Sequence, residues 1–143
     1  MRLQKNTLLA LYSVLEFAGQ PARPLSAAGI AAGLRVSPHH LAKVLRTLGR
    51  AGLLDSVRGA RGGYRFAANA RRVTLMDVIG LFEDIGAPPP RPRRARRPAE
   101  QALDEVLAEI DDTARATFGS VTLDTMLKLV KRRAMAEQRR ERG

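Results

Sequence analysis

The amino-acid sequence predicts a mainly α-helical fold with a small β-hairpin wing: a winged helix-turn-helix followed by a long C-terminal dimerisation helix. Three features of the 143-residue chain support this prediction. Apolar residues recur at helical spacing, a glycine-rich segment at 59–63 separates two strand-like runs, and a Pro/Arg-rich segment divides the chain. We therefore expect a winged-helix domain over 1–85, a linker over 86–98, dimerisation helices over 99–130 and a frayed basic tail over 131–143.

The first two helices are predicted from apolar spacing and from the residues that interrupt it. Leu8, Leu11 and Leu15 recur at helical intervals, and the segment GQPARP at 19–24 ends that pattern. Ser26 is a suitable N-cap for a short helix over 27–34, because its hydroxyl oxygen can accept a hydrogen bond from a free backbone N–H group. The first helix is apolar on a broad surface, which predicts burial on more than one side.

The third helix has the clearest start signal in the sequence. Ser37 supplies an N-cap, Pro38 occupies the first helical position, and Gly52 marks the expected end. Strand-like runs at 54–58 and 64–67 then flank the glycine-rich segment. This arrangement predicts a β-hairpin directly after the third helix.

Two more helical segments come after the linker, and a short fourth helix over 75–84, which Thr74 would cap, precedes it. The linker contains five prolines, five arginines and no hydrophobic residue larger than alanine, so it cannot pack against a core. A long helix over 99–118 therefore has an apolar stripe with no partner in its own linker, and we expect it to pair two chains in a homodimer. The stripe consists of Leu103, Val106, Leu107 and Ile110.

Charge is distributed unevenly along the chain. Lys and Arg number 25 against 14 Asp and Glu, which gives a formal net charge of +11. Residues 1–85 contain twelve basic and five acidic side chains, whereas residues 99–127 contain one basic and seven acidic side chains. The basic first part predicts contact with a polyanion such as nucleic acid, and the acidic later helix predicts a different role.

The predicted third helix has an apolar face and a basic face, as a DNA-recognition helix requires. The major groove of B-DNA admits one α-helix, and base edges are contacted by side chains near its N-terminus. A basic helix face that is merely solvated is the alternative interpretation. The base-contacting candidates are His39, His40 and Lys43, and the phosphate-contacting candidates further along the helix are Arg46, Thr47 and Arg50.

The predicted hairpin favours nucleic-acid binding over that alternative. Arg58, Arg61 and Arg65 lie within eight residues, among glycines that let a backbone approach closely. Arginine side chains suit the narrow, negatively charged minor groove. A phosphate-binding loop is a rival interpretation of GARGG, but the segment lacks the lysine and the following helix of such loops. The N-cap hydroxyls of Ser26 and Ser37 are further phosphate-contacting candidates.

The segment IAAGLRVSPHHLAKVLRTLGRAGLLDSVRGARGGYRF resembles the winged helix of the Rrf-type regulators, which include iron–sulfur-cluster, nitric-oxide-sensing and cysteine-metabolism repressors. The opening MRL, the segment VTLMDVIGLFE and the late TLDTML extend the resemblance over most of the chain. It implies a homodimer on a pseudo-palindromic promoter site, with Arg58 in a minor groove and His39 and Lys43 at base-contacting positions. We expect the chain to be a sequence-specific, double-stranded DNA-binding transcriptional repressor.

The sequence departs from that family in two places. Sensing members hold their cluster with three cysteines in the loop before the dimerisation helix, whereas this loop is the Pro/Arg-rich segment and the chain has no cysteine. Arg35 stands where the family usually has a turn glycine, and a positive φ there would cost roughly 1 kcal/mol. We therefore expect no cofactor and no iron–sulfur cluster, and regulation by an unidentified effector, a partner protein or expression level.

Other function classes find little support in the sequence. Adjacent histidines on a helix point about 100° apart, and no cysteine or carboxylate lies near His39 and His40, so no metal is expected. No acid–base or nucleophile–base constellation predicts an enzyme. No apolar run approaches the roughly 18 residues that span a bilayer, which predicts a cytoplasmic protein with no membrane partner. An RNA- or ribosome-associated winged-helix protein remains the alternative, although only Tyr64 and Phe66 offer aromatic rings near the basic face.

Overall fold

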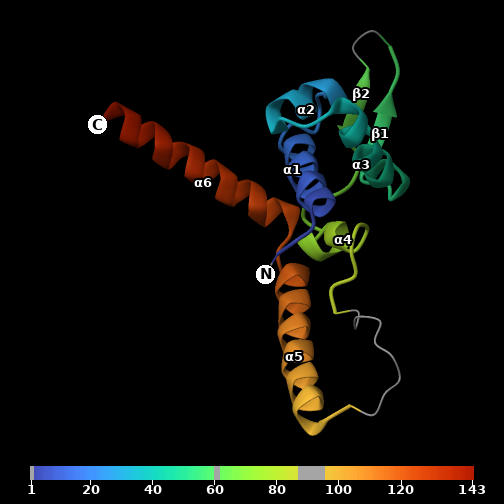
Figure 1. Ribbon diagram of the computed structural model, residues 1–143. Helices are drawn as coiled ribbons and strands as arrows, with labels where there is room; N and C mark the ends of the chain where they lie inside the picture. Colours follow the sequence, from blue (N-terminus) through green and yellow to red (C-terminus); the bar gives the residue numbers. More distant parts are fainter. Residues whose placement is uncertain (1, 60–61, 87–95) are drawn as a thin grey trace.

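The computed structural model describes residues 2–59, 62–86 and 96–143 of the chain. Figure 1 shows α1 to α4 and a two-stranded hairpin forming one body, from which α5 and α6 extend in different directions. The predicted fold class is confirmed. In chain order the elements are α1 (Lys5–Gly19), α2 (Ala27–Leu34), α3 (Pro38–Arg50), β1 (Leu54–Val57), β2 (Gly63–Phe66), α4 (Leu75–Ile79), α5 (Pro98–Ser120) and α6 (Leu123–Arg142).

Helix α1 is the centre of the body, as its broad apolar surface predicted. It contacts α3, α4, α6 and β2, and its Val14 and Phe17 are fully buried. The apolar face of α3 packs into the same core, where Leu41, Leu45 and Leu48 are fully buried. Because three side chains at helical spacing are held in this way, the opposite face of α3 must point to solvent.

The antiparallel hairpin places Leu54 opposite Phe66 and Val57 opposite Gly63. It is attached to the loop before α2 by two backbone hydrogen bonds of 2.9 Å, one in each direction between Leu25 and Tyr64. A side chain at Gly63 would clash with the backbone of that loop, because a Cβ there would overlap the Leu25 carbonyl oxygen. Glycine therefore permits the close approach that holds the wing against the body.

Two helix boundaries differ from the prediction. Helix α4 ends at Ile79 rather than near residue 84, because Gly80 comes next and the Leu81 and Phe82 N–H groups donate to carbonyl oxygens three residues earlier, as in a tight turn. Helix α6 continues to Arg142, so the predicted frayed tail over 131–143 is instead almost wholly helical. That segment contains no proline, and no glycine before residue 143, and most of its residues are good helix formers.

The junction between α5 and α6 is bound into the winged-helix body. The Leu123 N–H donates to the Val73 carbonyl oxygen at 2.9 Å, and the Leu75 N–H donates to the Val121 carbonyl oxygen at 2.9 Å. The Leu123 side chain is fully buried in the common core. The first turn of α6 therefore helps to complete the winged-helix core.

The turn between α2 and α3 has the strained conformation that the sequence suggested. Arg35 has φ 57° and ψ 44°, and it is the one non-glycine residue of the described chain with a positive φ. Its N–H group caps the end of α2 by donating to the carbonyl oxygen of Ala32. The left-handed conformation costs a side chain with a Cβ about 1 kcal/mol relative to the right-handed one.

Part of the predicted linker cannot be compared with the structure, because residues 87–95 lie outside the described residues. The chain described after that gap soon enters a helix, with Pro98 at the first position of α5 and Arg97 as its N-cap. None of the described helices is long and apolar enough to cross a membrane.

Candidate nucleic-acid interface

The exposed face of α3 carries four basic or imidazole side chains. The helix begins at Pro38 after the N-cap Ser37, whose hydroxyl oxygen accepts a hydrogen bond from the His40 N–H at 3.3 Å. Its buried leucines fix the rotation of the helix, so that the predicted candidates on the far side reach solvent. The exposed side chains are those of His39, Lys43, Arg46 and Arg50.

Two other predicted residues of α3 are half-buried and already engaged within the protein. The Nε2 atom of His40 lies 2.8 Å from Oδ1 of Asn6, a hydrogen bond that joins the first turn of α3 to the start of α1. The hydroxyl of Thr47 donates to the backbone oxygen of Lys43 at 3.3 Å. These two side chains are less available to a ligand than their neighbours on the exposed face.

The wing contributes two exposed arginines from its described part. Arg58 directly follows β1, and Arg65 lies within β2 opposite Asp55 in the register of the hairpin. The third arginine of the predicted set, Arg61, lies outside the described residues. The hydrogen bonds between Leu25 and Tyr64 hold this hairpin beside the start of α2.

The start of α2 is a second exposed helix N-terminus near the wing. Ser26 is its N-cap, and its hydroxyl oxygen accepts a hydrogen bond from the Gly29 N–H at 3.0 Å. Both N-cap serines, Ser26 and Ser37, are exposed and keep a hydroxyl hydrogen that can be donated to an oxygen of a ligand.

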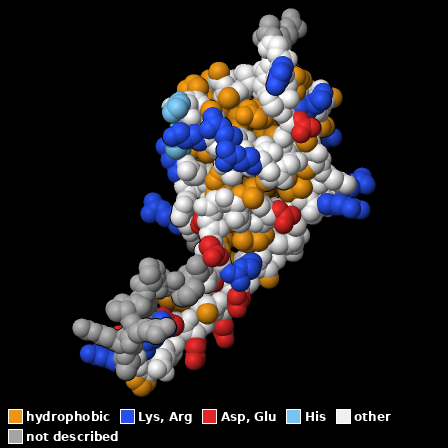
Figure 2. Space-filling view, turned by 90° about the vertical axis from the view of Figure 1, so that its right-hand side faces the viewer, with side chains coloured by type: hydrophobic (Ala, Val, Ile, Leu, Met, Phe, Trp, Pro, Cys, Tyr) orange, Lys and Arg blue, Asp and Glu red, His pale blue; other side chains and the backbone are white. Residues whose placement is uncertain are grey.

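Figure 2 shows how these groups are distributed over one face of the molecule. Lys and Arg side chains gather beside the histidines, both of which belong to α3, while Asp and Glu side chains line the arm formed by α5. The body thus offers a positively charged surface with a protruding hairpin, and the arm offers a negatively charged one. A polyanion is attracted to the first and repelled by the second.

Sequence reasoning missed the contacts that orient this surface. Nothing in the local pattern indicated that Asn6 would engage His40, because 34 residues separate them. The pairing of Leu25 with Tyr64 was likewise not visible in the sequence, although the glycine at 63 could have signalled a close backbone approach.

The chain lacks the donor set for an iron–sulfur cluster. Clusters are normally held by thiolates, and the chain contains no cysteine. Its two histidines are adjacent on α3, and one of them is hydrogen-bonded to Asn6. Residues 86–98, which would have to carry cluster ligands, contain only glycine, alanine, proline and arginine. Within the described residues, no three His, Cys, Asp or Glu side chains are grouped as metal ligands would be.

Comparison with known proteins identifies what this arrangement is similar to. Residues 3–129 match the model of the Rrf2 family, described as "Iron-dependent Transcriptional regulator". The chain is 49% identical over 130 residues to the putative HTH-type transcriptional regulator BadM of Rhodopseudomonas palustris, covering 91% of this chain and 83% of that protein.

A second relative has a solved structure. The HTH-type transcriptional regulator CymR of Bacillus subtilis is 31% identical over 103 residues, covering 72% of each chain. The structure of CymR, described as the global cysteine regulator of B. subtilis, superimposes with a TM-score of 0.74 at 27% identity and covers 90% of this chain and 98% of that one. These similarities are to regulators of transcription, and they do not support the RNA- or ribosome-associated alternative.

Proposed function

Because this chain belongs to the Rrf2 family of transcriptional regulators, we propose that it binds a specific double-stranded DNA site as a homodimer and represses transcription there. The observation that carries the proposal is the exposed basic face of α3 beside the arginine-bearing wing. A cytoplasmic location is part of the proposal, because the protein would have to reach its DNA site, and no enzymatic activity is part of it.

The geometry of α3 and the wing supports a division of contacts. His39 and Lys43 lie in the first two turns of α3, which is the part of a recognition helix that meets base edges. Arg46 and Arg50 lie further along the same exposed face and would contact phosphate oxygens. Arg58, which directly follows β1 in the wing, would enter a minor groove.

The remaining candidates contribute less directly. Ser26 and Ser37 would each donate a hydroxyl hydrogen to a phosphate oxygen beside the N-terminus of a helix, where the free N–H groups favour an anion. Arg65 would add to the positive potential of the wing. We assign His40 and Thr47 to the support of α3, because their side chains are hydrogen-bonded within the protein.

Dimerisation is supported by the stripe on α5. Its four apolar side chains are exposed in the single chain, with Leu103 at 57% and Ile110 at 54% of full exposure. None of the residues of α5, all of which the structure describes, is buried. Exposed leucine, valine and isoleucine side chains along one face of a helix favour association with another apolar surface. If the stripe packed against the same stripe of a second copy, the dimer would present two recognition helices to two half-sites.

The proposed function requires no iron. The chain has no thiolate, and its exposed histidine belongs to the face that we assign to DNA. Binding a cluster through that face would remove a base-contacting group. Protein purified without oxygen should therefore lack the visible absorption of an iron–sulfur cluster and bind DNA equally well with and without a chelator; stoichiometric iron and sulfide would contradict this.

The proposal is tested by selecting genomic fragments that the protein retains and measuring affinity for the selected site against a scrambled duplex. Lys43→Ala and Arg58→Ala should each cost about 1–3 kcal/mol on the selected site if each side chain contacts a base. Arg132→Ala, which removes the same charge from an exposed position in the middle of α6, is the matched control and should leave the preference unchanged. Equal affinity of the wild type for unrelated duplexes would contradict sequence-specific binding.

A further inference from the structure

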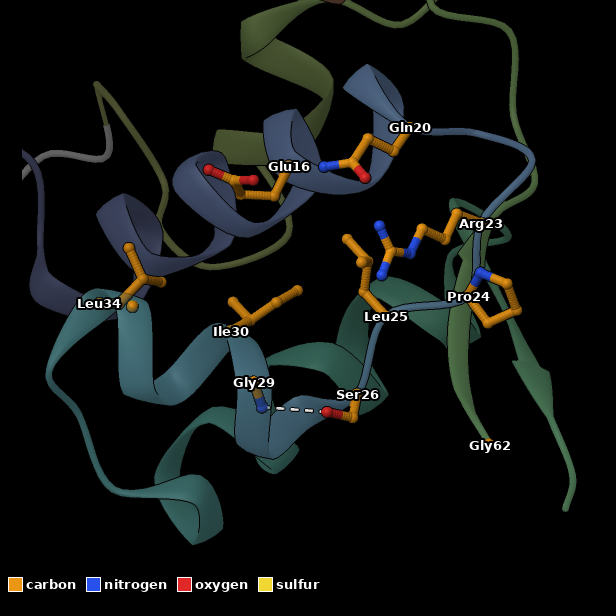
Figure 3. Close-up of a pocket in the computed structure, with 11 residues that line it drawn as sticks. Glu16, Gln20, Arg23, Pro24, Leu25, Ser26, Gly29, Ile30, Leu34 and Gly62 are labelled. Atoms are coloured by element: carbon orange, nitrogen blue, oxygen red, sulfur yellow. Dashed lines mark hydrogen bonds between the residues drawn. The ribbon is translucent and has the colours of Figure 1, made fainter. Parts of the chain in front are cut away.

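A groove of about 990 Å³ lies between α1 and α2, on the body but outside the exposed face of α3. Its floor is apolar, formed by Leu25, Ile30 and Leu34. Figure 3 shows the Ile30 side chain on the side of α2 that faces α1. The proposed dimer stripe lies outside this groove, and of the proposed DNA contacts only Ser26 lines it.

Charged and polar side chains stand above the apolar floor. Glu16 and Gln20 come from α1, and Arg23 comes from the loop that leads to α2. Figure 3 shows the guanidinium of Arg23 directed back over Leu25 into the groove. No hydrogen bond or ion pair joins the Arg23 or Glu16 side chain to another described residue, so neither charge is neutralised within the described part of the chain.

Glycines on α2 keep one wall of the groove open. Gly29 and Gly33 both line it, and a Cβ built on Gly33 would meet no atom within 4 Å. Glycine lowers the stability of a helix interior relative to alanine, and no close backbone contact requires it at this position. The space beside Gly33 is therefore available to a bound molecule and can be filled by substitution.

We propose that this groove binds a small organic acid, with its carboxylate on Arg23 and its apolar part on Ile30 and Leu34. A guanidinium pairs with a carboxylate through two parallel hydrogen bonds, which gives both orientation and affinity. Ligand sites of this size typically combine an apolar lining with a few polar groups. A DNA phosphate could also pair with the Arg23 guanidinium, but it would make no apolar contact with Ile30 and Leu34.

The groove is placed where a ligand would influence the wing of the DNA-binding surface. Leu25, in its floor, is hydrogen-bonded to Tyr64 of β2, and the Tyr64 ring meets Phe17 of α1 edge-on at a centroid distance of 6.5 Å. A molecule between α1 and α2 thus touches the segment that holds the wing. Its role as an effector rests on the proposed function, and by linkage DNA and acid must change each other's affinity by the same factor.

The test compares octanoate with octylamine, which carries the opposite charge on a chain of the same length, by calorimetric titration and thermal unfolding. Octanoate at millimolar concentration should bind, raise the unfolding temperature and change the affinity for the selected DNA site, whereas octylamine should do none of these. Arg23→Ser, at an exposed position, should weaken octanoate binding about tenfold or more. Gly33→Leu should abolish it by filling the groove.

Matched controls separate this proposal from simpler explanations. Gly119→Leu also adds a side chain at a helical glycine with open space around it, but on α5, and should leave octanoate binding intact. Equal binding of octylamine, no binding of octanoate, or binding that persists in Gly33→Leu would each overturn the proposal. If Arg23→Ser weakened DNA binding while octanoate did not bind, Arg23 would be a phosphate contact. If the protein bound octanoate but no DNA, the proposed function would be contradicted, whereas the proposed organic-acid site between α1 and α2 would be supported.

Discussion

The winged-helix body and α5 are both built from helices with leucines at helical spacing, yet the two regions differ in what covers those leucines. In α3, Leu41, Leu45 and Leu48 are fully buried by the rest of the body. In α5, Leu103 and Leu107 keep 57% and 45% of their exposure. The comparison teaches that periodicity identifies an apolar face, whereas the covering surface has to come from elsewhere in the chain or from a second chain.

The two regions also differ in charge. The exposed face of α3 is basic, whereas residues 99–127 contain seven acidic side chains and one basic. Two of the α5 carboxylates are used locally: Asp104 pairs with Arg96 at 2.9 Å, and Glu100 accepts a hydrogen bond from the Arg97 N–H at 3.0 Å. A helix with this charge is repelled by DNA, which favours a role in assembly rather than in DNA contact.

The largest expected effect is a substitution in the stripe of α5. Leu107→Asp would place a carboxylate in the proposed dimer interface and should dissociate the dimer, because a charge cannot be buried there without a partner. The affinity for a two-half-site operator should fall with it. Sedimentation should show the wild type near twice the chain mass of 15.6 kDa and the variant near that mass.

Ala108→Asp provides the matched control for that experiment. Ala108 is exposed on the same helix, about 100° away from Leu107, so the substitution adds the same charge outside the stripe. The control should remain a dimer. If the wild type sedimented at the single-chain mass at micromolar concentration, the proposal that a second chain covers the stripe of α5 would be contradicted.

A leucine-to-alanine pair sharpens the comparison. Leu45→Ala, in the body, should lower the free energy of unfolding by about 2–5 kcal/mol at any protein concentration, because the side chain is fully buried within one chain. Leu103→Ala, in α5, should have an effect that depends on protein concentration, because its partner is another chain. Urea unfolding at two protein concentrations measures both, and identical behaviour of the two variants would contradict the assignment.

The smallest expected effect is a change at Arg35, whose positive φ lowers the stability of the winged-helix body. Arg35→Gly should raise the free energy of unfolding by up to about 1 kcal/mol, since glycine adopts a positive φ without the Cβ penalty. Arg72→Gly, at an exposed turn position with negative φ, is the control and should not stabilise the protein. Thermal unfolding distinguishes them, and equal changes would show that the strain at Arg35 is negligible.

Local chemistry explains why much of the candidate site could be predicted. An N-cap serine followed by proline sets the start of α3, and four apolar positions at helical spacing set its rotation, so that His39, Lys43, Arg46 and Arg50 emerge together on the exposed face. Glycines with a strand-like run on either side likewise predict a hairpin. These signals act over a few residues and need no knowledge of the rest of the fold.

The sequence by itself thus determined the order of the elements, the recognition face of α3, the arginine-bearing wing and the absence of thiolate ligands. The tertiary structure alone decided that His40 turns to Asn6, that Leu25 pairs with Tyr64, and that Leu123 completes the core. Each of these contacts joins residues that are tens of positions apart. Such contacts depend on how whole elements pack against one another, and no local pattern of residue types encodes that packing.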